Sequence, residues 1–299
     1  MIRQIANQLR KERDAEIIMT GPHLAAMLGM KLARRRGKFL AVHYHHQGVK
    51  SPAVWRFLYR VALDRFDWVT FPSDFVRDEA CALYPPLAAR SLTIRYPNDP
   101  PPPITRDERA AARRAWNLGD DAFVIGNGGW LIHRKRFDIF LRVAALVAAA
   151  EPKAHFLIAG GGEDEGKLKL LAAELGIADR IVWLGWLENM QPFYHALDAL
   201  HFNAEWDALP VTPQEAVATG IPLVASVANG GLREIFDSTL AHRILGNHDV
   251  EALTSQLIEI ARDPQLANQR AQSSREYFLK LSNPEKIAAA HIKLMTKRP

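Results

Sequence analysis

Short apolar runs alternate with longer segments of helical pattern from residue 123 to the end of the chain. Apolar runs bounded by glycine or polar residues predict buried strands. The expected strands are residues 123–126, 155–159, 181–184, 199–202, 223–225 and 242–245. The expected helices are residues 137–150, 167–175, 190–197, 212–218, 250–262 and 264–281. This alternation is typical of a doubly wound α/β domain, in which helices cover both faces of a parallel sheet and ligands bind at the carboxyl ends of its strands.

A shorter version of the same pattern occupies the first hundred residues. Its expected strands are residues 15–19, 39–43, 68–71 and 91–94, and its expected helices are residues 24–35, 55–63 and 74–83. The chain opens on an amphipathic helical segment, without the apolar centre and cleavage site of a signal peptide. Four strands are few for a doubly wound domain, so we expect this domain to be incomplete.

A proline-rich segment separates the two patterns. Five prolines stand between Pro97 and Pro103, and such a segment can continue neither a helix nor a central strand. We therefore expect three parts: a shortened N-terminal domain at residues 1–97, a C-terminal domain at 98–282, and a terminal helix at 283–299 that packs back on the N-terminal domain.

Charge is distributed unevenly between the two halves. The chain of 299 residues has a net charge of +5, but residues 1–100 carry sixteen Lys and Arg against nine Asp and Glu. A solvated helix face explains any single basic cluster, whereas the asymmetry favours an anionic partner, with a membrane surface, a lipid-linked phosphate and nucleic acid as the options. The chain has no recognisable nucleic-acid-binding motif, so we do not expect it to bind nucleic acid. The single cysteine, Cys81, can form no intrachain disulfide, which fits the cytoplasm or the inner face of the membrane.

Two carboxylates, Asp207 and Glu215, form the most informative motif. We expect Asp207 in a loop and Glu215 in the first turn of a helix that Gly220 ends, with Pro222 opening the next strand. Unpaired N–H groups and the helix dipole favour phosphate at such a helix N-terminus. The spacing therefore predicts a site for a phosphorylated ligand such as a sugar nucleotide.

Other segments at the expected carboxyl edge carry further candidates. The run Arg134-Lys135-Arg136 can grip a diphosphate, with the lysine as a point charge and an arginine in bidentate fashion, although a solvated basic loop is the competing interpretation. The glycines at 160–162 and at 230–231 allow close approach of the backbone to a ligand. Trp183 and Trp186 are expected to pack rather than to bind.

Three histidines, His43, His45 and His46, follow a strand of the first domain. Three close histidines can ligate zinc, but no carboxylate or cysteine stands at supporting spacing. We therefore rank metal binding below a sugar-binding or proton-handling role for His43, and expect no metal.

Taken in order, these segments resemble the retaining GT-B glycosyltransferases of glycosyltransferase family 4, also called glycosyl transferases group 1. The resemblance runs from about residue 15 to the end and is strongest over residues 123–236. It rests on the Lys135 turn, the glycine turn at 160–162, the strand and turn at 182–185, the two-carboxylate motif and the Gly-Gly-x-x-Glu turn at 230–234.

The resemblance implies transfer of a sugar from a nucleoside diphosphate sugar to a glycan or lipid-linked acceptor, with retention of configuration. The donor is a UDP- or GDP-sugar, and neither metal nor other cofactor is expected. Asp207 and His43 are the implied catalytic residues, which face the donor sugar or its phosphate. Glu215 holds the ribose and Lys135 the diphosphate. The implied nucleotide-sugar-binding positions are Glu215, Lys135, Arg134, Gly161, Leu187, Leu209, Pro210 and Gly230.

The chain departs from the family pattern in three places. Asp207 stands where the family usually has Glu, with Glu205 at the wrong spacing to replace it. Trp130 stands where many members have an arginine, for which Arg134 can compensate. The N-terminal domain lacks the first strands and glycine-rich loop of the family. Two alternatives to the transferase therefore stay open: a nucleotide-sugar-binding module or inactive truncated homologue, and a nucleotide-sugar epimerase on the same fold.

Overall fold

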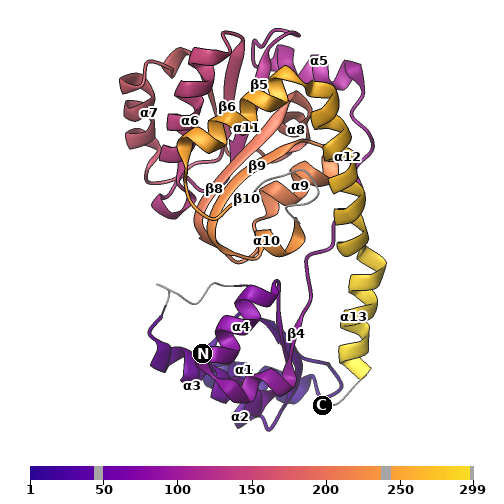
Figure 1. The fold of residues 1–299 in the computed structure, drawn as a ribbon. Coiled ribbons are helices and arrows are strands. Elements are labelled where there is room, and N and C mark those ends of the chain that lie inside the picture. The colour runs from indigo at the N-terminus through magenta and orange to yellow at the C-terminus, as the bar shows by residue number, and fades with distance from the viewer. Residues whose placement is uncertain (44–49, 237–243, 297–299) are drawn as a thin grey trace. The chain divides into compact units, whose positions relative to one another are not determined.

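Two parallel β-sheets organise the chain, one in each of its two units (Figure 1). The computed structural model describes residues 1–43, 50–236 and 244–296. Unit 1 comprises Met1–Pro97 and Ser282–Pro299, and unit 2 comprises Asn98–Leu281. The expected α/β class with parallel sheets is confirmed.

The sheet of unit 1 has four strands whose spatial order follows the chain. They are β1 (Ile18–Thr20), β2 (Gly37–Ala41), β3 (Phe66–Phe71) and β4 (Ser91–Thr93), and every neighbouring pair is parallel. The helices are α1 (Ile2–Lys11), α2 (Leu24–Leu32), α3 (Pro52–Arg65), α4 (Asp74–Leu83) and α13 (Pro284–Thr296). Since parallel crossovers are right-handed, the connecting helices α2, α3 and α4 cover one face of the sheet. On α13, Leu294 packs against Phe39 and Ala41 of β2.

Many cations of the basic N-terminal half bind carbonyl groups within unit 1. The Arg35 guanidinium donates to the carbonyls of Leu9 and Glu12 at 2.9 and 2.6 Å, beside the end of α1. Arg36 donates to the Asp64 carbonyl at 2.8 Å and Arg90 to the Leu63 carbonyl at 2.8 Å, both near the end of α3. These bonds satisfy helix C-terminal carbonyls that lack partners within the helix. Part of the excess positive charge of residues 1–100 therefore stabilises the fold of unit 1.

The sheet of unit 2 has six parallel strands in the order β10-β9-β8-β5-β6-β7. The strands are β5 (Phe123–Gly128), β6 (Ala154–Ala159), β7 (Ile181–Gly185), β8 (Ala199–Asp207), β9 (Leu223–Gly230) and β10 (Ile244–Leu245). Counted along the chain, this is the doubly wound order 3-2-1-4-5-6, which reverses between β5 and β8. Ligands bind such sheets at the carboxyl ends of the strands on either side of the reversal.

Helices cover both faces of this sheet. They are α5 (Arg106–Ala115), α6 (Phe137–Ala150), α7 (Glu165–Glu174), α8 (Gln191–Ala196), α9 (Val211–Thr219), α10 (Leu232–Ile235), α11 (Val250–Arg262) and α12 (Pro264–Leu281). Apolar residues of α6, α7 and α11 share one core with the strands. On the other face, Gly126 of β5 lets α8 approach, because a Cβ there would lie 2.6 Å from Leu197 and 2.7 Å from Phe193.

Several expected bounds differ from the observed ones, most of all those of β8 and β9, and one helix was not expected. Strands β8 and β9 run five residues beyond their expected ends and pair as far as Asp207 and Gly230. Helix α5 was not expected, although its start carries a capping box in which Thr105 and Glu108 bond each other's backbone N–H. Cys81 is half-buried, with its Sγ 3.5 Å from the Ser91 hydroxyl. Among the described residues, no helix is both long and apolar enough to cross a bilayer.

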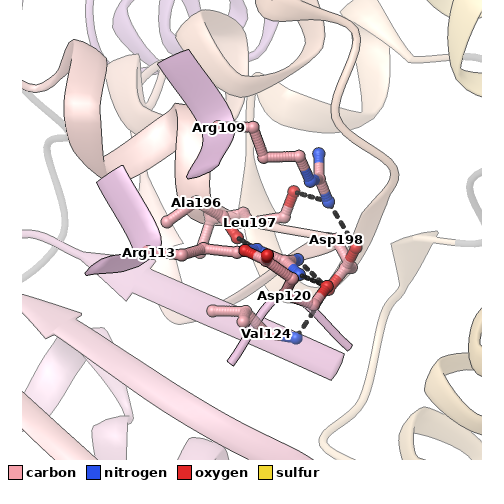
Figure 2. A network of polar contacts seen from close by, with 7 residues as sticks. All are labelled: Arg109, Arg113, Asp120, Val124, Ala196, Leu197 and Asp198. Carbon is pink, nitrogen blue, oxygen red and sulfur yellow. Dashed lines mark hydrogen bonds and ion pairs between the residues drawn. The ribbon is translucent and has the colours of Figure 1, made fainter. Parts of the chain in front are cut away.

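Asp198 joins α5, α8 and the amino ends of β5 and β8 (Figure 2). Its carboxylate accepts bonds from the Arg113 guanidinium and the Val124 N–H, both at 2.7 Å, and from Arg109. The Arg113 side chain is only 4% exposed, and it also donates to the Ala196 carbonyl at 3.2 Å. This carboxylate therefore neutralises a buried cation at the amino edge of the sheet.

We expect Asp198→Asn to destabilise unit 2, because it leaves the buried Arg113 cation without a counter-ion. Breaking such a pair by removing one partner costs about 2–4 kcal/mol for a partly exposed carboxylate. Urea unfolding at pH 7 measures the loss. The control is Asp121→Asn, which breaks an exposed pair with Lys153 and should leave the unfolding midpoint unchanged. Equal midpoints for the two variants would contradict the prediction.

His201 is fully buried on β8, with its ring centroid 5.5 Å from that of Phe140. Burial is the main cause that lowers the pKa of His201 to about 3. The folded chain thus keeps His201 neutral, while the unfolded chain protonates it below its ordinary pKa of about 6.5. The stability that this residue contributes is fully present above pH 6.5 and is lost as pH falls from 6.5 toward 3.

We expect the free energy of unfolding of His201→Gln to decrease less steeply, as the pH is lowered, than that of the wild-type chain. One proton taken up on unfolding corresponds to about 1.4 kcal/mol per pH unit between pH 6.5 and 4. Urea titrations of both proteins at pH 7, 6 and 5 measure the difference in slope. Parallel curves for the two proteins would show that His201 is protonated in the folded state.

Candidate functional site

Asp207 is the last residue of β8 rather than a loop residue, and its backbone is fixed by β9. The pair Asp207–Gly230 closes the ladder between the two strands. Gly230 has φ of +144°, and a Cβ there would lie 2.0 Å from the Asp207 carbonyl oxygen. A side chain at 230 would therefore push the two strands apart. Gly230 thus ends a strand rather than standing in a turn, and it fixes the position of Asp207.

Lys135 and Asp207 form an ion pair at the reversal of strand order. The Lys135 Nζ lies 2.6 Å from the Asp207 Oδ2, although 72 residues separate them in sequence. Arg134 approaches the same oxygen at 3.4 Å and donates to the Trp206 carbonyl at 3.3 Å. The side chains of Lys135 and Asp207 are 11% and 14% exposed, so the pair is little screened by solvent. The side chains of Lys135, Arg134 and Asp207 together carry one net positive charge.

The third cation of the run, Arg136, does not join this pair. Its guanidinium makes two bonds of 2.9 Å to the Asp138 carboxylate. Glu205 lies 3.8 Å from Arg136 and 3.4 Å from His133. The structure thus pairs Arg136 separately from Lys135 and Arg134. Glu205 is paired in this second group, which supports Asp207 as the motif's first carboxylate.

Glu215 lies in the second turn of α9 rather than the first, because the helix begins at Val211 with Pro210 as its N-cap. Among residues 1–43, 50–236 and 244–296, no side chain caps this N-terminus, so the first N–H groups of α9 lack a side-chain partner there. The Thr212 hydroxyl donates to the Gly128 carbonyl at 3.2 Å and ties the start of α9 to the end of β5. The helix N-terminus therefore faces the same edge of the sheet as the Lys135–Asp207 pair.

Among the described residues, one side chain forms a hydrogen bond with the Glu215 carboxylate. The Tyr194 hydroxyl donates to Glu215 Oε2 at 2.6 Å, and the Tyr194 ring is buried. Burial, followed by the charge of Glu215, raises the pKa of Tyr194, so the phenol stays protonated and acts as the donor. Sequence reasoning missed Tyr194, since nothing in its local pattern distinguishes it from a core aromatic.

The glycine turn after β6 supports an aromatic pair. Gly160 has φ of +122°, and a Cβ at Gly161 would lie 2.9 Å from the Trp186 indole nitrogen. Trp186 and Trp130 meet edge to face, with ring centroids 4.9 Å apart. Both are about 60% exposed, at 60% and 59%. The expectation that Trp186 is mainly a packing residue therefore holds only in part, because much of its ring faces solvent.

Three of the predicted positions are placed as follows. Leu187 is half-buried in the loop after β7. Leu209 is buried, and Pro210 is buried at the N-cap of α9. The Gln214 side chain donates to the Pro210 carbonyl at 2.8 Å. The Leu209 side chain is thus part of the core, so any contact with a ligand at this position falls to its backbone.

His43 belongs to unit 1, immediately beyond β2. Its Nδ1 lies 3.1 Å from the Tyr96 hydroxyl, and the two rings stack with centroids 5.6 Å apart. Partial desolvation lowers the pKa of His43, although much of the residue is exposed to solvent. His45 and His46 lie outside the described residues. Across residues 1–43, 50–236 and 244–296, no group of three or more His, Cys, Asp or Glu is placed to hold a metal ion.

The fold agrees with that of known proteins that the chain resembles. A family model for glycosyl transferases group 1 matches residues 108–277, more than half of the chain. The chain therefore belongs to this glycosyltransferase family, as its motifs predicted. Its class is that of a sugar-transferring enzyme.

Two curated relatives are mannosyltransferases. The GDP-mannose-dependent alpha-(1-6)-phosphatidylinositol monomannoside mannosyltransferase of Mycolicibacterium smegmatis is 26% identical over 296 residues, covering 92% of this chain and 75% of the relative. The lipopolysaccharide core biosynthesis mannosyltransferase LpsB of Rhizobium meliloti is 29% identical over 206 residues, covering 65% of this chain and 57% of LpsB. The chain thus spans less than two thirds of LpsB.

Solved structures support the fold. Anabaena HepE in complex with UDP and glucose aligns with a TM-score of 0.82 at 15% identity, covering 98% of this chain and 81% of HepE. WaaG, a glycosyltransferase of lipopolysaccharide biosynthesis, aligns with a TM-score of 0.74 at 16% identity, covering 96% of this chain and 80% of WaaG. The expected GT-B-like architecture is confirmed.

We expect Asp207→Asn to strengthen binding of inorganic pyrophosphate, because the substitution removes the anion that competes for Lys135 and Arg134. A partly exposed ion pair is worth about 1 kcal/mol, which corresponds to roughly fivefold in affinity. Isothermal titration calorimetry at low salt measures the change. The matched control is Asp138→Asn, which releases Arg136 instead and should change the affinity less. Equal or weaker binding by Asp207→Asn would contradict the prediction.

Proposed function

We propose that this protein transfers a hexose from a nucleoside diphosphate sugar to a hydroxyl of a glycan or lipid-linked acceptor, with retention of configuration and without a metal ion. The observation that carries the proposal is the net positive charge of Lys135 and Arg134 around Asp207, at the strand reversal and beside the open N-terminus of α9. Such an edge suits a diphosphate.

Each predicted residue takes a role in this proposal. Lys135, Arg134 and the N-terminus of α9 hold the diphosphate, and Glu215 accepts hydrogen bonds from the ribose hydroxyls. Asp207 faces the donor sugar or its phosphate. His43, on unit 1, is the second proposed catalytic residue. The backbone at Gly161, Leu187, Leu209, Pro210 and Gly230 completes the nucleotide-sugar site.

The chemistry follows from where charge develops. The acceptor hydroxyl oxygen bonds to the anomeric carbon on the face from which the diphosphate leaves. Its proton passes to an oxygen of the leaving diphosphate, and the bond from the anomeric carbon to the diphosphate oxygen breaks. Negative charge grows on the leaving diphosphate. Fixed cations and helix N–H groups stabilise this charge in a site of low solvent exposure. Lys135 and Arg134 thereby supply the role that a divalent cation has in other transferases.

The relatives' names suggest the first substrates to test. The Mycolicibacterium relative is named for GDP-mannose and a phosphatidylinositol mannoside, and the HepE structure holds UDP and glucose. We propose a UDP- or GDP-hexose donor and a polysaccharide or glycolipid acceptor. Exposed Arg56, Phe57 and Arg60 on α3 support a cytoplasmic enzyme in peripheral contact with an anionic membrane.

We expect the wild-type chain to transfer hexose from GDP-mannose or a UDP-hexose, and to retain this activity in EDTA. The two carboxylates should then separate binding from turnover. Glu215→Ala removes the ribose contact and should weaken nucleotide affinity by about tenfold, the effect of about 1.4 kcal/mol. Asp207→Ala should lower kcat by at least about a hundredfold with nucleotide affinity kept or increased, since loss of an electrostatic group at the reacting centre has this order of effect.

Radiolabel transfer to phosphatidylinositol mannoside and oligosaccharide acceptors measures kcat, and calorimetry with UDP and GDP measures affinity. Nucleotide binding without turnover on any acceptor would favour a binding module over the transferase. No nucleotide binding by the wild-type chain would reject the proposed site. Equal losses of affinity in both variants would reject the division of roles between Asp207 and Glu215.

A further inference from the structure

The buried hydroxyl of Tyr194 forms a hydrogen bond, in addition to the packing of the Tyr194 ring in the core. Tyr194 stands on α8, in the crossover from β7 to β8, and its ring is 1% exposed. Phe193 next to it packs entirely through carbon atoms and is fully buried. A buried phenol requires a hydrogen-bond partner that phenylalanine does not. Tyr194 finds this partner in Glu215, 21 residues further along the chain.

The geometry of the contact is that of a strong hydrogen bond. The 2.6 Å between Tyr194 Oη and Glu215 Oε2 lies within the range of about 2.5–2.7 Å for an O–H donor to a carboxylate. The phenol stays protonated, because burial and the carboxylate both oppose its ionisation. The bond therefore persists wherever Glu215 is ionised.

The bond restrains one oxygen of the carboxylate and leaves the other oxygen available to a ligand. Glu215 is half-buried, and its Oε1 accepts no hydrogen bond from residues 1–43, 50–236 or 244–296. The backbone of Glu215 is held separately, because the Thr219 hydroxyl donates to its carbonyl at 2.7 Å. A glutamate side chain has several rotamers and loses entropy when it is immobilised. Tyr194 selects one rotamer before any ligand arrives.

We propose that Tyr194 is a positioning residue that orders the Glu215 carboxylate, so that Oε1 meets a ribose hydroxyl of the nucleotide. This inference rests on the proposed function, in which Glu215 binds the ribose. Its consequence is selectivity: Tyr194 increases affinity for a nucleotide with an intact ribose diol and not for a nucleotide that lacks it. A purely structural tyrosine would affect both nucleotides equally.

The test compares binding of four variants by calorimetry. The probes are UDP and GDP, followed by the 2′,3′-dideoxy analogue of the one that binds more tightly. The variants are Tyr194→Phe, Glu215→Ala, the double variant, and Thr219→Val as the control. Thr219→Val removes a hydroxyl that bonds the same residue, but through its backbone carbonyl. Thermal unfolding of each variant confirms that it is folded.

We expect Tyr194→Phe to weaken binding of the ribonucleotide by about fivefold, as for loss of one hydrogen bond of about 1 kcal/mol. Binding of the dideoxy analogue should stay unchanged, so the ratio of the two affinities falls. In the Glu215→Ala background, Tyr194→Phe should cause no further loss, since the two residues act as one unit. Thr219→Val should keep the wild-type ratio.

Three outcomes would overturn the positioning role while the ribose role of Glu215 stands. They are unchanged affinity in Tyr194→Phe, equal losses for the ribonucleotide and its dideoxy analogue, and additive losses in the double variant. A different pattern marks failure of the proposed function itself. In that case Glu215→Ala keeps the wild-type preference for the ribonucleotide, or the wild-type chain binds neither UDP nor GDP, and both ideas are rejected together.

Discussion

The reversal of strand order between β5 and β8 is the constraint on which the candidate site depends. The two strands are in register at Ile125–Ala199 and Gly126–Leu200. Beyond this point, among the described residues, β5 pairs only with β6, and β8 pairs only with β9. The chain segments that follow β5 and β8 therefore end at one edge, where Lys135 meets Asp207 at 2.6 Å.

The two edges of the unit 2 sheet have different chemistry. At the amino edge, Asp198 bonds Arg113, Arg109 and the Val124 N–H (Figure 2). Both guanidinium groups also donate to backbone carbonyls there, so these cations are held within the protein. At the carboxyl edge, Asp207 faces both Lys135 and Arg134, which leaves positive charge for a ligand. We therefore assign the fold-stabilising role to the amino edge and the proposed anion site to the carboxyl edge.

The two carboxylates of the motif are held by different forces. Asp207 is held through its backbone by the β8–β9 ladder and through its side chain by cations. Glu215 is held through its helix and by the neutral donor Tyr194. Cations paired with a carboxylate can exchange it for a phosphate, whereas a carboxylate bonded to a buried phenol keeps its orientation. These environments suit a group near the diphosphate and a group that accepts bonds from ribose hydroxyls, respectively.

The sequence by itself determined the α/β class, the bounds of α6, α11 and α12, and the segments that carry Lys135, Asp207 and Glu215, because periodicity and local motifs are properties of neighbouring residues. It underestimated β8 and β9, since polar residues such as Asn203 interrupt the apolar run, whereas the ladder depends only on backbone groups of the adjacent strand. Only the tertiary structure decided which charges pair and that Tyr194 orders Glu215. Those partners are distant in the chain, and the strand reversal and the packing of α8 beside α9 bring them within hydrogen-bond distance.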